Sequence, residues 1–243
     1  MKSKSTCRLC HTSSLLKESH IVTKSIFNLL RDKTINNRFY EIGGGTENIV
    51  QDGPKEYLLC DKCEQKIGRY EKYFKEAVHL GRHGIKIIQG KNIAIIRNLD
   101  YKKVKLYLLS LLWRMSISSL PQFADVSLAN NEDVIRKRIL EEKPGESCEY
   151  QIAAIIPLIN GKIEEGWMFF PIISTHPHET VYYMIVGGIL YSISMTQQDK
   201  CFHKYLLYES GNWAMPLIDF YKIPFIKDFV DSNFGENDLP PKN

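Results

Sequence analysis

Two cysteine pairs are the residues of this chain whose type and spacing specify chemistry most directly. Cys7 and Cys10 form one C-x-x-C pair, Cys60 and Cys63 form a second, and 49 residues lie between the pairs. Four thiolates arranged as two such pairs are a common ligand set for tetrahedral zinc. The alternative is four ordinary buried thiols, but the repeated spacing favours a structural Zn²⁺ that closes a long loop.

Two further residues near these pairs can take part in hydrolysis. His20 lies in residues 18–22, whose pattern predicts a short strand, and Glu64 directly follows the second pair. A neutral imidazole can accept a proton from water near pH 7, as phosphodiester hydrolysis requires. A carboxylate binds Mg²⁺ through oxygen. The alternative for His20 is a packing role beneath the first cysteine pair.

The second cysteine pair must be held by a helix. Apolar residues recur three and four positions apart in residues 61–78, which predicts an amphipathic helix. Its first turn would supply the last two thiolates, and its free N–H groups would favour their negative charge. The opposite side of this helix carries four basic residues that form a candidate nucleic-acid surface. They are Lys66, Arg69, Lys72 and Lys75. A solvated face is the alternative, because Glu64, Glu71 and Glu76 lie among them.

The remaining segments predict an α+β fold. Apolar spacing and turn residues predict two groups of elements on either side of residue 84. Before it we expect a helix at 24–31 and strands at 38–42 and 55–59, besides the helix at 61–78. After it we expect helices at 101–116 and 131–142, and strands at 93–96, 150–159, 167–173, 181–186 and 189–195, with a further candidate at 205–208 and a helical turn at 226–230. The later strands read as an antiparallel meander.

This order of elements predicts two structural parts and a tail. Residues 1–84 would form a zinc-binding module, residues 85–232 an α+β domain of unknown role, and residues 233–243 a flexible tail. Positive charge is concentrated in the first part. Residues 1–84 hold 15 Lys and Arg against 10 Asp and Glu, whereas the remainder holds 17 against 18. This distribution is compatible with a polyanionic partner for the first part.

The residues around the cysteine pairs resemble the HNH endonuclease family, in its zinc-binding treble-clef subgroup with two C-x-x-C pairs. The resemblance covers about residues 7–80 and rests on the first pair, the segment Glu18-Ser19-His20-Ile21, and Leu58-Leu59 leading into the second pair and Glu64. It implies a ββα unit that holds Mg²⁺ or Mn²⁺ against a scissile phosphate, apart from the structural zinc. It also implies that His20 is the general base, that Glu64 is a catalytic metal ligand, and that the substrate is nucleic acid, most commonly DNA.

Three positions depart from the family pattern, one of which is an asparagine expected shortly before the second pair, where Lys55-Glu56-Tyr57 stands. An aspartate or histidine usually precedes the basic histidine, and a histidine usually follows the second cysteine pair. This chain has Ser19 and Glu64 there. The alternative function is therefore a non-catalytic, zinc-stapled module with a degenerate HNH site, which binds nucleic acid or protein. In that case residues 85–243 would carry the partner surface.

The location of the protein follows from its cysteines and its apolar runs. The N-terminus lacks the apolar stretch of a secretory signal, so we expect a cytoplasmic protein in which thiols serve metal binding. Cys148 and Cys201 stand outside the two pairs. The longest uncharged run, residues 181–195, is too short to span a bilayer as a helix, so we expect no membrane association.

Overall fold

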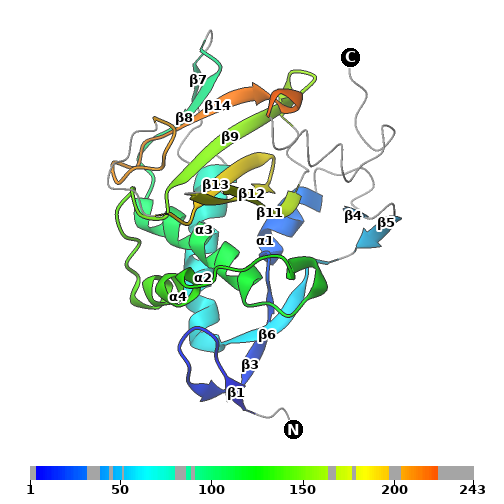
Figure 1. Cartoon of the computed structure of the whole chain (residues 1–243), viewed down its shortest axis with the longest axis vertical. Coiled ribbons are helices and arrows are strands. Elements are labelled where there is room, and N and C mark those ends of the chain that lie inside the picture. Colours follow the sequence, from blue (N-terminus) through cyan, green and yellow to red (C-terminus); the bar gives the residue numbers. More distant parts are fainter. Residues whose placement is uncertain are drawn as a thin grey trace.

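A computed structural model gives the fold of the chain (Figure 1). It describes residues 4–31, 39–43, 46–50, 52–79, 86–88, 91–163, 168–176, 179–196 and 204–223. A large sheet occupies the upper part of Figure 1, helices cross beneath it, and the first strands of the chain lie at the lower end near the N-terminus. The structure thus has the mixed α+β composition that the sequence predicts.

The N-terminal part contains three small antiparallel strand pairs and two helices. Its elements are β1 (Ser5–Thr6), β2 (Ser13–Ser14), β3 (Leu16–His20), α1 (Lys24–Arg31), β4 (Phe39–Gly43), β5 (Thr46–Val50), β6 (Lys55–Cys60) and α2 (Asp61–Phe74). β1 pairs with β2, β3 with β6, and β4 with β5. The predicted strand around His20 is confirmed, although it begins at Leu16 and ends at His20. The helix predicted at 61–78 is also confirmed, and its last turn, Lys75–His79, is π-helical.

One eight-stranded sheet dominates the rest of the described chain. Its main strand order is β11–β12–β13–β9–β14–β8–β7, and β10 pairs with the end of β9. The strands are β7 (Lys86–Ile88), β8 (Ile93–Ile96), β9 (Ile152–Ile159), β10 (Lys162–Ile163), β11 (Met168–His176), β12 (Glu179–Val186), β13 (Ile189–Ser194) and β14 (Trp213–Asp219). β11, β12 and β13 form the predicted antiparallel meander. β9 pairs with β13, although β11 is the next long strand after β9 in the sequence.

β14 lies between β8 and β9 and changes its pairing at Pro216. Residues Trp213 to Pro216 pair antiparallel with β8, whereas Leu217 to Asp219 pair parallel with β9. Proline has no N–H to donate to a strand ladder, so the change of partner accommodates it. The candidate strand at 205–208 is only an isolated bridge between Leu206 and Ala153. The helical turn and tail predicted beyond residue 223 lie outside the described residues.

Helix α3 (Tyr101–Ser116) is the centre of the core, as its almost uniformly apolar sequence predicts. All of its residues are buried except Lys102, Lys103 and Ser116. Asp100 caps its N-terminus by accepting a hydrogen bond from the Lys103 N–H at 3.0 Å. The fourth helix, α4 (Asn131–Glu141), ends at Glu142, which takes a left-handed conformation.

Buried aromatic rings join the N-terminal part to the sheet. Phe74 of α2 lies 4.4 Å from Tyr107 of α3 and 5.8 Å from Tyr191 of β13, measured between ring centroids. Tyr191 lies 5.9 Å from Trp213 of β14. One continuous hydrophobic cluster therefore includes residues from both sides of position 84. The division at residues 84 and 85 stays a prediction, since those residues lie outside the described part.

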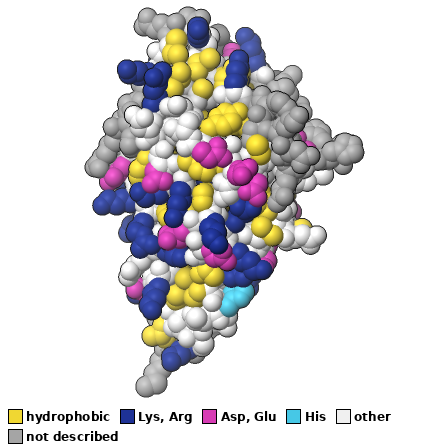
Figure 2. Space-filling view, turned by 90° about the vertical axis from the view of Figure 1, so that its left-hand side faces the viewer, with side chains coloured by type: hydrophobic (Ala, Val, Ile, Leu, Met, Phe, Trp, Pro, Cys, Tyr) yellow, Lys and Arg dark blue, Asp and Glu magenta, His cyan; other side chains and the backbone are white. Residues whose placement is uncertain are grey.

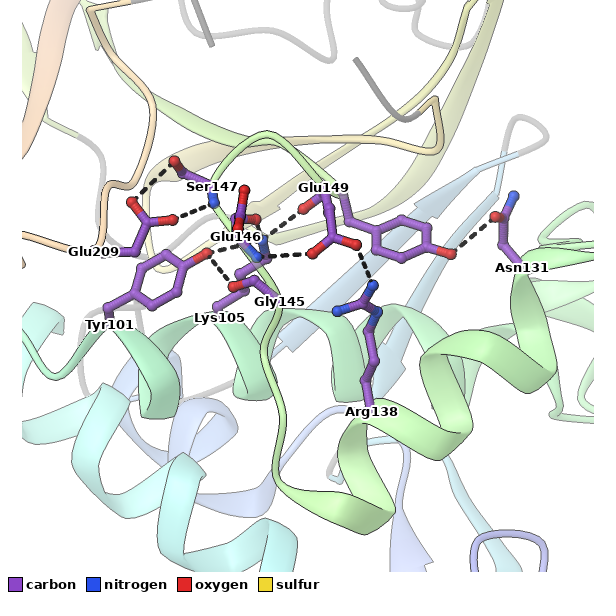
Figure 3. Close-up of polar contacts among 10 residues, drawn as sticks. Tyr101, Lys105, Asn131, Arg138, Gly145, Glu146, Ser147, Glu149 and Glu209 are labelled. Carbon is purple, nitrogen blue, oxygen red and sulfur yellow. Dashed lines mark hydrogen bonds and ion pairs between the residues drawn. The ribbon is translucent and has the colours of Figure 1, made fainter. Parts of the chain in front are cut away.

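A buried lysine fixes the loop that leads from α4 to β9 (Figure 3). Lys105 of α3 is 1% exposed, and its ammonium donates to the Tyr101 hydroxyl at 3.0 Å and to the carbonyls of Glu146 and Glu149 at 2.5 Å each. Arg138 of α4 pairs with the Glu149 carboxylate at 2.5 Å. All three Lys105 donors have acceptors, as a buried ammonium requires. The network thereby fastens α3, α4 and this loop together.

No described helix combines the length and the apolarity needed to cross a bilayer.

Candidate functional site

The four predicted zinc ligands come together. The sulfur atoms of Cys7, Cys10, Cys60 and Cys63 all lie within 4.8 Å of one another. The Sγ atoms of Cys10 and Cys60 are 3.8 Å apart. Zn–S bonds of about 2.3 Å in a tetrahedron place sulfurs about 3.8 Å apart, so this separation suits a shared Zn²⁺. The donor set therefore fits zinc, and all four thiols are free.

Local backbone geometry holds each cysteine pair. The first pair lies in the turn between β1 and β2, where the Cys7 N–H donates to the Thr12 carbonyl at 3.0 Å and the His11 N–H to the Cys7 carbonyl at 2.9 Å. The Arg8 N–H reaches the Leu58 carbonyl of β6 at 2.9 Å, which ties this turn to the second pair. Cys60 ends β6 and is the N-cap of α2, and Cys63 lies in the first turn of that helix.

The electrostatic surroundings of the four thiols differ. Burial raises the pKa of the Cys10 thiol, but hydrogen bonds, first with Thr12 and then with Cys7 and Cys63, outweigh it and lower that pKa to about 6. Burial, followed by hydrogen bonding with Cys60 and the charge of Cys7, raises the pKa of Cys63 well above its ordinary value. Four adjacent sulfurs cannot all ionise without a cation to neutralise them, and zinc binding would displace their protons.

Of the two other cysteines, the structure describes Cys148, which does not belong to this cluster. Cys148, which the sequence places outside the pairs, is disulfide-bonded. Cys201 lies outside the described residues.

Helix α4 reaches the cysteine cluster through Arg136. This side chain is 13% exposed, forms an ion pair with Asp133 at 2.8 Å, and donates from Nη1 to the Leu9 carbonyl at 2.8 Å. Leu9 lies between Cys7 and Cys10, so the backbone of the first pair is held from outside the N-terminal part. The sequence gives no sign of this contact, because its acceptor is a main-chain carbonyl.

His20 occupies the end of β3 and has a carboxylate partner that the sequence did not reveal. Its Nε2 atom lies 2.9 Å from Oδ1 of Asp52, and the side chain is 17% exposed. A carboxylate accepts, so Nε2 carries the proton and Nδ1 is left as the basic nitrogen. Arg114 of α3 donates to the His20 carbonyl at 2.9 Å. Both the ring and the backbone of His20 are therefore held in place.

The loop before β6 holds Asp52 for this contact. The Gly53 N–H donates to Asp52 Oδ1 at 2.9 Å, and Lys55 forms an ion pair with Oδ2. Any β-carbon on Gly53 would lie 2.3 Å from the Phe27 ring of α1, so only glycine fits there. The hydrogen bond from Lys55, with further contributions from His20 and Gly53, holds the pKa of Asp52 well below its ordinary value despite partial burial. Asp52 is therefore ionised at neutral pH.

Glu64, the predicted catalytic metal ligand, instead contacts Ser19. The Ser19 hydroxyl donates to Glu64 Oε1 at 2.5 Å, and Ser19 is 2% exposed. Successive residues of a strand point to opposite faces, so the Ser19 and His20 side chains lie on different sides of β3. Ser19 and Glu64, which both depart from the family pattern, thus contact each other. The roles assigned to His20 and Glu64 stay predictions.

Of the four basic residues predicted to contact nucleic acid, two have partners at the end of α4. Lys66 donates to the Leu140 carbonyl at 2.5 Å, and Arg69 lies 3.6 Å from the Glu142 carboxylate. Lys72 is exposed and Lys75 half-buried. Figure 2 shows acidic and basic side chains interleaved across the middle of the side that is on the left in Figure 1. Nucleic-acid binding by α2 stays a prediction.

Within the described ranges, the four cysteines form the one group of three or more His, Cys, Asp or Glu side chains with metal-ligating proximity. The structure thus supports a site for structural zinc and leaves the predicted Mg²⁺ or Mn²⁺ untested. Comparisons of the chain with models of known protein families, with curated proteins and with solved structures found no significant match.

Proposed function

We propose that the protein is an HNH-like, metal-dependent endonuclease that hydrolyses phosphodiester bonds of nucleic acid, with a separate structural zinc. The observation that carries the proposal is the contact between His20 and Asp52 at the end of β3, at the other end of the β3–β6 strand pair from Cys60. An ionised carboxylate on one imidazole nitrogen orients the ring and stabilises its charged form, while the other nitrogen is left to take a proton from water.

The order of elements supports a treble-clef arrangement of the N-terminal part. A cysteine-bearing turn between β1 and β2 is followed by the antiparallel pair β3–β6, and α2 begins directly after β6. Zinc bound by both cysteine pairs would join this turn to the first turn of α2. In this proposal the zinc has a structural role, because four protein thiolates fill a tetrahedral site and leave no position for water.

Phosphodiester cleavage also requires charge neutralisation on the phosphate. Mg²⁺ and Mn²⁺ are hard cations, and Mg²⁺ is usually held by one or two carboxylates and completed by water and substrate phosphate. On the face of β3 that carries His20, the exposed Glu18 offers such a carboxylate, whereas Glu64 lies with Ser19 on the opposite face. A divalent cation would supply Lewis-acid stabilisation of the developing charge. We therefore propose Glu18 as a further candidate ligand of this cation, and the role of Glu64 stays a prediction.

The test is cutting of plasmid, linear duplex DNA, single-stranded DNA and RNA in Mg²⁺, in Mn²⁺ and in EDTA. We expect cutting of at least one substrate with a divalent cation and none in EDTA. We also expect that added Mg²⁺ restores cutting while the zinc content stays at one per chain. Folded, zinc-loaded protein that cuts none of these substrates would refute the proposal.

The contact between Ser19 and Glu64 favours a second candidate function. Where the family has two metal ligands, this chain has a serine whose hydroxyl is bonded to the carboxylate. Such a pair suits a non-catalytic, zinc-stapled module that binds DNA or a protein partner, the latter through residues 85–243. His20→Ala separates the two candidates, because it would abolish cutting in the first and leave partner binding unchanged in the second.

A further inference from the structure

The strand pair β3–β6 turns one face to solvent, and this outer face holds more than His20. Glu18 lies opposite Tyr57 in the strand register, and His20 lies opposite Lys55. Residues opposite each other, and residues two apart on one strand, share a face. We use "outer face" for Glu18, His20, Lys55 and Tyr57. The Asp52 carboxylate contacts two residues of the outer face, His20 and Lys55.

The side chains of the outer face are exposed enough to contact a ligand. Tyr57 is 47% exposed, one of the most exposed large side chains with apolar character among the described residues. Ser19, on the opposite face of β3, is 2% exposed. The Lys55 side chain is 32% exposed and forms its ion pair with Asp52 at the surface. An exposed ion pair of this kind contributes little to stability, so Lys55 can exchange Asp52 for another anion.

The chemistry of Tyr57 and Lys55 matches the two parts of a nucleotide. A tyrosine ring offers a stacking surface to a base, and an ammonium offers a positive charge to a phosphate. The two residues are two positions apart on β6, so their Cα atoms are about 7 Å apart. In a duplex the faces of the bases are covered by their neighbours, whereas an unpaired base exposes its face to an aromatic side chain.

We propose that the outer face binds an unpaired nucleotide directly beside His20, with the base stacked on Tyr57 and a phosphate held by Lys55. The substrate class is thus single-stranded nucleic acid, or the unpaired parts of a folded one. This inference deepens the proposed function and rests on it for the cutting step. The binding step stands on the outer face alone and is measured without cutting.

The binding experiment uses full-length, zinc-loaded protein that carries His20→Ala, so that no probe is cut. Short fluorescein-labelled oligothymidylate, oligouridylate and a hairpin duplex serve as probes, and fluorescence anisotropy gives the dissociation constants over a range of salt concentrations. Tyr57→Ala should weaken single-strand binding about tenfold or more, whereas Tyr57→Phe should retain it. Lys55→Ala should weaken binding and reduce the salt dependence by about 0.7 in the logarithmic slope.

Matched controls come from β10 of the large sheet and from the short helical turn that follows β14. Tyr221→Ala, in the short helical turn Phe220–Lys222, removes a half-buried tyrosine, and Lys162→Ala, in β10, removes an exposed lysine. Neither residue belongs to the N-terminal part. Both variants should bind oligothymidylate as the parent does, which separates a local effect of the outer face from a general loss of aromatic or positive surface.

The outcomes separate this inference from the proposed function. Tighter binding of the duplex than of single strands, or equal binding by Tyr57→Ala and its parent, would overturn the inference while leaving cutting by the wild type intact. Single-strand binding that depends on Tyr57 in a protein that cuts nothing would support the inference and refute the nuclease. A protein that neither cuts nor binds any probe would overturn both.

Discussion

Nε2 of His20 lies 2.9 Å from Oδ1 of Asp52, although 32 positions separate the two residues in the chain. The contact joins the end of β3 to the loop before β6, and Lys55 holds the second oxygen of the same carboxylate. A histidine fixed in this way has one free ring nitrogen in a defined direction. This relationship turns a single histidine into a candidate general base.

Asp52→Asn should reduce cutting with little effect on zinc content. The amide cannot stabilise a charged imidazole as the carboxylate does, and its NH₂ group favours the wrong tautomer of His20. We expect a loss of about 10-fold or more in kcat with a small change in KM, measured on a labelled oligonucleotide. Equal kcat in Asp52→Asn and wild type, at equal zinc content, would remove Asp52 from the site.

Asp52 should also contribute to acid stability. Its folded-state pKa is lowered, first by the hydrogen bond from Lys55, so its contribution is present above the unfolded carboxyl pKa of about 4 and is lost as the pH falls below that value. The difference in unfolding free energy between wild type and Asp52→Asn should therefore shrink from pH 6 toward pH about 2, when followed by urea unfolding. The effect should be small, because the carboxylate is 41% exposed. A difference that stays constant with pH would contradict this assignment.

Cys60→Ser should abolish stoichiometric zinc binding. Cys60 is 7% exposed, and its Sγ lies 3.8 Å from that of Cys10, so a serine there removes one of four converging ligands. We expect wild type to carry one zinc per chain by elemental analysis, and to lose about 4 kcal/mol of unfolding free energy on chelation from a zinc level about 1,000-fold above the dissociation constant.

The matched control for zinc binding is His11→Asn. His11 follows Cys10, is exposed and has φ 59°, a backbone conformation that asparagine tolerates. This variant should retain one zinc per chain. Zinc loss in His11→Asn together with retention in Cys60→Ser would mean that the ligand set is different.

Lys66→Ala and Lys72→Ala should differ in stability, although both residues lie on α2. Lys66 donates to the Leu140 carbonyl near the end of α4, whereas Lys72 is exposed. A hydrogen bond from a charged donor is worth about 1.5–3 kcal/mol, and exposed substitutions usually change stability by less than about 0.5 kcal/mol. Thermal unfolding of both variants measures the difference. Equal stability would show that Lys66 is free to serve a nucleic-acid surface instead.

Because of Lys105, the free energy of unfolding should rise with pH in the alkaline range. Burial, with a further contribution from the charge of Arg138, lowers its pKa to about 8 from an ordinary value of 10.5. Between these two values the unfolded chain binds more protons than the folded chain, so the free energy of unfolding rises with pH. We expect the unfolding free energy of wild type minus that of Lys105→Met to increase from pH 8 to pH about 10. A flat difference over that range would mean that the folded-state pKa is not lowered.

Local sequence pattern predicts the helices well, because each is specified by its own residues. The stripe of Ile67, Tyr70 and Phe74 identifies α2, and these residues are buried as expected. The same holds for α3, whose nearly continuous apolar sequence requires a central position. The paired spacing of the cysteines likewise predicts their cluster, since zinc chemistry relates spacing to ligand geometry.

Local sequence pattern does not predict contacts between segments that are distant in the chain. Strand β14 is not among the strands that the sequence predicts. Proline is unfavourable within a strand, and the change of partner from β8 to β9 at Pro216 accommodates it. Asp52 has no predicted site role, since its contact depends on a histidine from another strand. Lys66 is predicted to lie on a surface, since no local pattern identifies its acceptor, a carbonyl 74 positions away.

The most direct measurement of the central claim is imidazole rescue of His20→Ala under single-turnover conditions. The substrate is the nucleic acid that wild type cuts best, with Mg²⁺ or Mn²⁺ present and the zinc content verified as equal in both proteins. The account predicts a loss of about 100-fold or more in the cleavage rate and a partial recovery that increases with imidazole concentration, because the free base replaces the missing side chain. Cutting by His20→Ala at the wild-type rate, without imidazole, would contradict the assignment of His20 as the general base.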